Sequence, residues 1–185
     1  SSNGSRVGIR GSEPLVEGLN GIYQAEFEIY FDDGTDDDKP FTQRNIFIGI
    51  EGVLGTLIAG RFETALEQAQ NKVDLFNELY GDIQNSITVN DNRESNSITY
   101  STPDLSGFRL YADLISSEDV DDSNGTSLAA TYENGGFYAA LAYDLDVEYE
   151  KTGELDDKGN EISSNDTSAV RAVIQYSFGD FQLGL

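Results

Sequence analysis

Arginine and carboxylate groups carry most of the chemistry that this sequence offers. The 185 residues contain no Cys and no His, so a disulfide framework, a thiolate metal site and a histidine general base are all excluded. All seven arginines lie in or beside segments of alternating polarity, whereas the four lysines lie between such segments. The arginines are Arg6, Arg10, Arg44, Arg61, Arg93, Arg109 and Arg171. If these guanidinium groups face the interior of the protein, they need water to hydrate them or carboxylates to pair with them.

The segment 62–94 can supply those carboxylates. Its acids include Glu63, Glu67, Asp74, Glu78, Asp82 and Asp91. Arginines on one side of a narrow passage and acids on the other would set up a transverse field, which selects solutes by size, charge and dipole. We assign Asp74, Glu78 and Asp82 to the acidic side because they lie in the middle of the segment. The alternative for any single pair is a surface salt bridge worth under ~1 kcal/mol.

The elements that must position these groups are strands. Polarity alternates with a period of two in ten segments: 5–12, 21–31, 43–52, 54–61, 95–102, 107–117, 126–133, 136–149, 167–178 and 181–185. Short links (13–20, 52–53, 103–106, 134–135 and 179–180) take turns with long acidic ones (32–42, 62–94, 118–125 and 150–166). This pattern predicts an all-β fold, an antiparallel up-and-down β-barrel that crosses a membrane with short turns at one rim and long loops at the other.

The two faces of the predicted strands differ in polarity. In 136–149, alternate residues from Phe137 to Tyr149 are apolar, and the intervening positions include Asp144 and Asp146. We expect the apolar row to face lipid, since the apolar faces often end in aromatic residues, as at membrane interfaces. A sandwich would also alternate, and aromatic residues favour strands in general. In 43–52 the pattern is less regular, because Arg44 shares its parity with Ile46, and we expect protein to cover both faces there.

A short amphipathic helix is predicted inside the segment 62–94. Residues 64–67 fit a capping box, and apolar residues recur at helical spacing from Leu66 as far as Gly81. If the segment folds inward, the inner face of strand 43–52 would supply the apolar surface that such a helix needs.

Composition excludes several classes of function. The net charge of −23 argues against a nucleic-acid partner. Two carboxylates at a fixed distance could serve a glycosidase, but nothing singles out such a pair, so we expect no enzyme. The chain starts at "SSNGSRVGIRG" without an initiator Met and stops at "FQLGL" within an apparent strand, and we interpret it as part of a longer protein.

Three stretches resemble the trimeric general porins of the Gram-negative outer membrane. "SRVGIRG" (5–11) is similar to their second strand, "QRNIFIGIEGVLGTLIAGR" (43–61) to the following hairpin, and "NRESNSITYSTPDLSGF" (92–108) to the return after their constriction loop. The order and spacing of the three carry the resemblance.

The resemblance implies a 16-stranded water-filled barrel, with residues 1–185 forming part of one porin domain and supplying about strands two to eleven. The loop 62–94 would fold inward as the constriction. Arg6, Arg44 and Arg93 match the basic constriction cluster, with Arg10 at a neighbouring position and Arg61 at the Gly-Arg strand end. The Pro-Glu-Phe-Gly-Gly motif of the enterobacterial loop is absent. A homotrimer in the outer membrane, among lipopolysaccharide, would pass ions and small hydrophilic solutes without a cofactor.

The alternative is a secreted calcium-binding β-domain of an adhesin. "DDGTDDDK" (32–39) and "ELDDKGNE" (154–161) are rich in oxygen ligands, but neither has the spacing of a known calcium loop. In an outer membrane the acidic loops could instead share bridging Ca²⁺ or Mg²⁺ with lipopolysaccharide, with plain hydration as the simpler interpretation.

Overall fold

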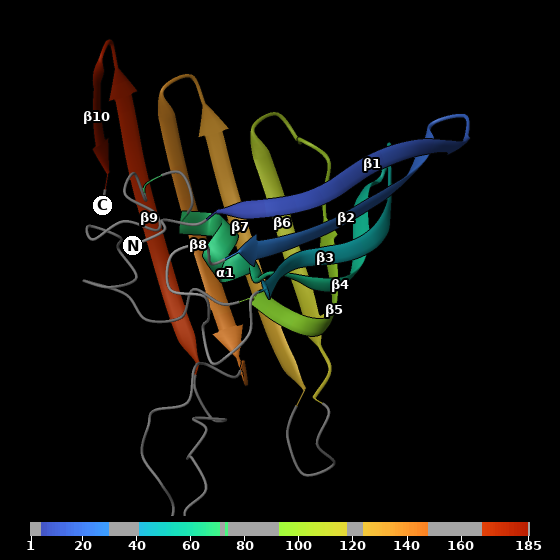
Figure 1. Ribbon diagram of the computed structural model, residues 1–185. Coiled ribbons are helices and arrows are strands. Elements are labelled where there is room, and N and C mark those ends of the chain that lie inside the picture. Colours follow the sequence, from blue (N-terminus) through green and yellow to red (C-terminus); the bar gives the residue numbers. More distant parts are fainter. Residues whose placement is uncertain are drawn as a thin grey trace, which may run out of the picture.

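The computed structural model shows one antiparallel sheet whose strands follow one another in chain order (Figure 1). It describes residues 5–29, 41–70, 73, 93–117, 124–147 and 168–184. The strands are β1 (Arg6–Val16), β2 (Leu19–Ile29), β3 (Phe41–Gly52), β4 (Gly55–Glu63), β5 (Arg93–Ser101), β6 (Phe108–Ile115), β7 (Gly125–Asn134), β8 (Phe137–Leu145), β9 (Ala169–Phe178) and β10 (Phe181–Gly184). Within the described residues the sheet is open, with β1 and β10 at its two edges. The ten predicted strands and their meander are therefore confirmed.

The β1–β2 hairpin is tighter than the sequence suggested. Residues 13–20 were expected to form a link, but β1 continues to Val16 and β2 begins at Leu19. Only Glu17 and Gly18 remain in the turn, where Gly18 has a φ of 78° that favours glycine. Several residues of 13–20 are polar or small, so the sequence did not show that most of this stretch belongs to strands. Pairing across the hairpin holds these residues in β1 and β2.

The sheet has an apolar outer face and a more polar inner face. Along β8 and β9, side chains alternate between exposed and buried: Leu141 is 59% and Val170 71% exposed, whereas Ala142 is 2% and Val173 4% exposed. The exposed row is apolar, and no second sheet covers it in the described part of the chain. This arrangement differs from a sandwich, in which the apolar face meets another sheet.

The apolar row of 136–149 ends earlier than predicted. β8 stops at Leu145, and Asp146 takes a φ of 52°, in the left-handed region, which breaks the alternation. Val147 is consequently 0% exposed and packs with Ile115 instead of facing outward. Its assignment to the outward row was wrong, and Tyr149 lies outside the described residues.

A β-bulge explains the irregular pattern of β3. Ala25 pairs with Ile46 and Phe27 with Gln43, so the single residue Glu26 faces both Arg44 and Asn45. The bulge shifts the parity by one, and Arg44 reaches the inner face although it shares its sequence parity with outward-facing Ile46 and Ile48.

The single described helix, α1 (Ala65–Gln70), lies on the concave inner side of the sheet (Figure 1). The Thr64 hydroxyl oxygen accepts a hydrogen bond from the Glu67 amide at 3.2 Å, which confirms the predicted N-terminal cap. The described helix spans Ala65–Gln70 and Val73 lies in a turn, whereas the rest of the predicted stretch as far as Gly81 lies outside the described residues. The helix packs on β6 to β9 instead of the predicted inner face of β3, because small residues on β7 and β8, such as Ala129, Ala140 and Ala142, leave room for it there.

No helix in the described ranges is long and apolar enough to cross a membrane.

Candidate functional site

Arg44 forms the centre of an ion-pair cluster on the inner face of β1, β2 and β3. Its Nε donates to Glu26 Oε1 at 3.1 Å, and its Nη1 donates to Glu28 Oε2 at 3.0 Å. The Arg44 side chain is 10% exposed, so the pairing is screened less than at an open surface. Arg6 Nη1 lies 3.7 Å from the same Glu26 oxygen.

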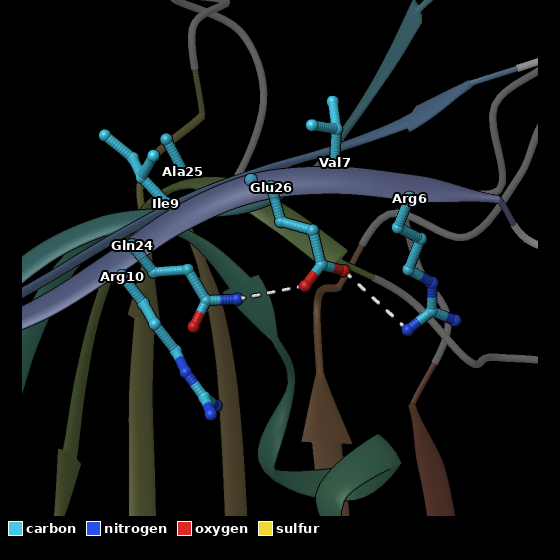
Figure 2. A pocket seen from close by; sticks show the side chains of 8 residues that line it. Arg6, Val7, Ile9, Arg10, Gln24, Ala25 and Glu26 are labelled. Atoms are coloured by element: carbon cyan, nitrogen blue, oxygen red, sulfur yellow. Dashed lines mark hydrogen bonds and ion pairs between the residues drawn. The ribbon is translucent and has the colours of Figure 1, made fainter.

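Strand alternation orients the members of this cluster. Figure 2 shows Arg6, Arg10, Gln24 and Glu26 directed to the side on which α1 lies, with Val7, Ile9 and Ala25 directed to the opposite side. Together with Gly8, these seven residues line a hollow of about 280 Å³, and Gln24 Nε2 donates to Glu26 Oε2 at 3.3 Å. The pairing of β1 with β2 sets Arg6 opposite Glu28 and Arg10 opposite Gln24, so cross-strand neighbours differ in charge or polarity.

A second cluster surrounds Arg93 at the start of β5. Its Nη2 lies 2.8 Å from Glu63 Oε1 and 3.3 Å from Glu67 Oε1. Its Nε donates to Asn45 Oδ1 at 3.1 Å, and Asn45 Nδ2 donates to Glu63 Oε1 at 3.4 Å. Asn45 follows Arg44 in the bulge, so the β3 irregularity joins the two clusters into one continuous network of charges.

Arg61 lies close to this network but makes no ion pair with it in the described residues. In the β3–β4 pairing it stands opposite Ile46, and the charged groups nearest to it include Glu94, Arg93 and Glu67. It lines a hollow there with Gln43, and its Nη1 donates to Ser95 Oγ at 3.0 Å. Of the five arginines predicted for the constriction, Arg6, Arg44 and Arg93 are in ion pairs on the inner face, Arg10 points to the same side as Arg6, and Arg61 is hydrogen-bonded to Ser95 near them.

The carboxylates that pair with these arginines come partly from the wall. Glu26 and Glu28 belong to β2 and Glu63 is the last residue of β4, whereas Glu67 lies in α1. Sequence reasoning did not assign Glu26 and Glu28 to the site. A trial alignment of β1 against β2 would have indicated them, since Arg6 and Glu28 are direct partners. Asp74, Glu78 and Asp82 lie outside the described residues.

Buried polar residues of β6 to β9 hold α1 against the inner face, and sequence reasoning missed them. Asp113 Oδ2 accepts from the Ala65 amide at 2.5 Å, and Ser127 Oγ accepts from the Leu66 amide at 3.1 Å. These anchors satisfy amides of the first turn, which have no partner within a helix. On the other side, Arg171 Nη1 donates to the Leu66 carbonyl at 3.1 Å, and the Tyr138 hydroxyl donates to the Ala69 carbonyl at 2.7 Å. No sequence motif marks these residues.

The chemistry of this arrangement is electrostatic. Charged groups fixed on strands can hydrate a passage and discriminate between solutes by charge. Among the described residues, no group of three or more acidic side chains is placed to hold a metal ion. The two acidic stretches considered for calcium, 32–39 and 154–161, lie outside those residues, as do the acidic loops considered for bridging cations.

Comparison with known proteins places this geometry in context. The family model described as "Gram-negative porin" matches residues 1–185. The major outer membrane protein P.IB of Neisseria sicca is 32% identical over 152 residues, which make up 75% of this chain and 42% of that protein. The chain therefore spans less than half the length of this relative.

Two solved structures share the fold. The OmpF structure from Salmonella typhi, in complex with daunomycin, matches with a TM-score of 0.72 at 18% identity, over 97% of this chain and 56% of that one. An anion-selective porin from Comamonas acidovorans matches with a TM-score of 0.71 at 23% identity, over 100% of this chain and 57% of that one. At these identities the likeness establishes the fold alone.

Proposed function

The chain belongs to the Gram-negative porin family, and from this membership we propose that the complete protein forms a water-filled channel in the bacterial outer membrane. Ions and small hydrophilic solutes would diffuse through it down their own gradients. A relative named as a major outer membrane protein supports this location.

The contrast between the two faces of the sheet is the observation that carries the proposal. Exposed apolar side chains such as Leu141, Val170 and Ile174 cover the outer face, which suits contact with lipid. The opposite face holds Arg44, with both of its carboxylate partners, and Arg93. Placing such charges against lipid would cost ~2–4 kcal/mol each near the bilayer midplane, whereas a water-filled interior can hydrate them.

The finer features of this channel are also proposals. We infer that the complete barrel has 16 strands, that three copies assemble, and that the loop from residue 62 to 94 narrows the passage. Arg6, Arg10, Arg44, Arg61 and Arg93 would line one side of the constriction, with Asp74, Glu78 and Asp82 on the loop. The protein would act without catalysis or a resident cofactor, with divalent cations bridging its acidic loops to lipopolysaccharide. A secreted adhesin domain would be incompatible with so extensive an exposed apolar face in water.

Conductance across a planar lipid bilayer tests the proposal. Purified complete protein, checked as a folded oligomer by its altered gel migration after boiling, should produce stable conductance steps. The same preparation after boiling should produce none. Folded oligomers that insert into the bilayer without conducting would refute the channel.

A further inference from the structure

We propose that the β2 carboxylates of Glu26 and Glu28 cancel the positive charge of the adjacent arginines, so that the channel passes cations in preference to anions. This inference rests on the proposed function and adds a substrate class to it. An arginine-lined wall alone would be expected to attract anions. Because carboxylates pair with these arginines, we instead expect the wall to favour cations.

Contacts around Arg44 give the first reason. Two carboxylates meet this one guanidinium, at 3.1 Å from Glu26 and 3.0 Å from Glu28, and Glu26 also lies 3.7 Å from Arg6. Arg6 is the more open of the two arginines, with 37% of its side chain exposed, against 10% for Arg44. Glu26 and Glu28 would therefore largely shield Arg44 from a passing anion.

Strand pairing fixes the positions of these carboxylates. Glu26 and Glu28 are neighbours on one face of β2, and β2 is hydrogen-bonded to both β1 and β3. The β3 bulge directs Arg44 toward them from the other side. Neutralisation is therefore part of the wall itself and does not depend on how the loop is placed.

Carboxylates also match the arginines over the rest of this network. The ion pairs join three arginines, Arg6, Arg44 and Arg93, to four carboxylates, Glu26, Glu28, Glu63 and Glu67. The positive charges in these pairs are therefore fully met by negative ones. The sequence adds acid elsewhere: residues 71–92 contain Asp74, Glu78, Asp82 and Asp91 against Lys72, and the chain has a net charge of −23. With the arginines neutralised, this excess of acid favours cations.

The reversal potential in a KCl gradient measures this preference directly. We expect the unmodified channel to favour K⁺ over Cl⁻, most strongly at low salt, where screening is weak. At about 7 Å in water, one unit charge changes the local concentration of a monovalent ion about threefold. The double variant Glu26→Gln/Glu28→Gln should therefore shift the K⁺/Cl⁻ permeability ratio toward anions by at least about threefold.

Glu51→Gln provides the matched control. Glu51 belongs to β3 and points to the same face as Phe47 and Gly49 by alternation, but it makes no ion pair with an arginine in the described residues. Its loss removes one negative charge without uncovering a positive one. We expect it to change the permeability ratio less than either Glu26→Gln or Glu28→Gln.

Several outcomes would overturn the inference. A preference of the unmodified channel for Cl⁻ would overturn it, and this test does not depend on whether any variant folds. A folded, conducting double variant with a shift no larger than that of Glu51→Gln would also do so. Both results would leave the proposed channel intact, whereas loss of all conductance in the unmodified folded protein would refute the channel and this inference together.

Discussion

Removing the Asp113 carboxylate should loosen the attachment of α1 to the sheet. Asp113 Oδ2 accepts a hydrogen bond from the Ala65 amide at 2.5 Å, and the Asp113 residue is 1% exposed. A hydrogen bond to a charged group contributes about 1.5–3 kcal/mol, and its loss here would leave the Ala65 amide buried without this acceptor. For Asp113→Ala we take a loss of about 2 kcal/mol in the free energy that attaches α1 to the sheet. This loss makes the population of the detached helix about 30 times larger.

Amide hydrogen exchange of the folded protein in lipid reports that population. The amides from Ala65 to Ala69 should exchange about 30 times faster in Asp113→Ala, because local opening limits their exchange. Asp113→Asn keeps an oxygen acceptor and should show a smaller effect. Ser97→Ala removes another buried hydroxyl, one that donates to the Gly60 carbonyl instead of contacting α1, and should leave the α1 amides unchanged. Equal exchange in Asp113→Ala and the unmodified protein would show that the carboxylate does not hold the helix.

Three further substitutions probe other parts of the account. Tyr138→Phe removes the 2.7 Å hydrogen bond to the Ala69 carbonyl and should speed exchange in α1 about fivefold, for a loss of about 1 kcal/mol; unchanged exchange would exclude this anchor. Arg44→Ala removes the guanidinium that meets both Glu26 and Glu28 and should shift the reversal potential toward cations, so a shift toward anions would contradict the charge assignment. Leu141→Arg places a charge on the outer face and should destabilise the folded protein in lipid vesicles by ~2–4 kcal/mol in denaturant titrations; an unchanged midpoint would argue against lipid contact at this position.

Alternating polarity was enough to predict the strands. In β8, apolar residues alternate with small or acidic ones. Such alternation predicts both the strand and the face of it that points outward. The prediction failed where backbone geometry changed without a signal in residue type. Asp146 in a left-handed conformation ends the β8 row, and the bulge at Arg44 and Asn45 reverses the parity of β3.

The site was harder to predict because its contacts join distant parts of the chain. Arg93 was recognised, but its partner Asn45 lies 48 positions away, and the Arg171 bond to Leu66 spans 105 positions. A single sequence does not contain the strand register that brings such residues together. The side of the sheet taken by α1 depended in the same way on small residues of β7 and β8, whose role shows only once the helix is in place.

The central claim is that the outer face of this sheet meets lipid while the inner face meets water. Because these 185 residues contain no cysteine, single cysteines introduced at Leu141 and Gln24 can each carry a fluorophore in the protein reconstituted into lipid bilayers. We predict that spin-labelled lipids will quench the fluorophore at Leu141 and that aqueous iodide will quench the one at Gln24. Quenching of the Leu141 fluorophore by iodide alone, or of the Gln24 fluorophore by lipid alone, would contradict the account.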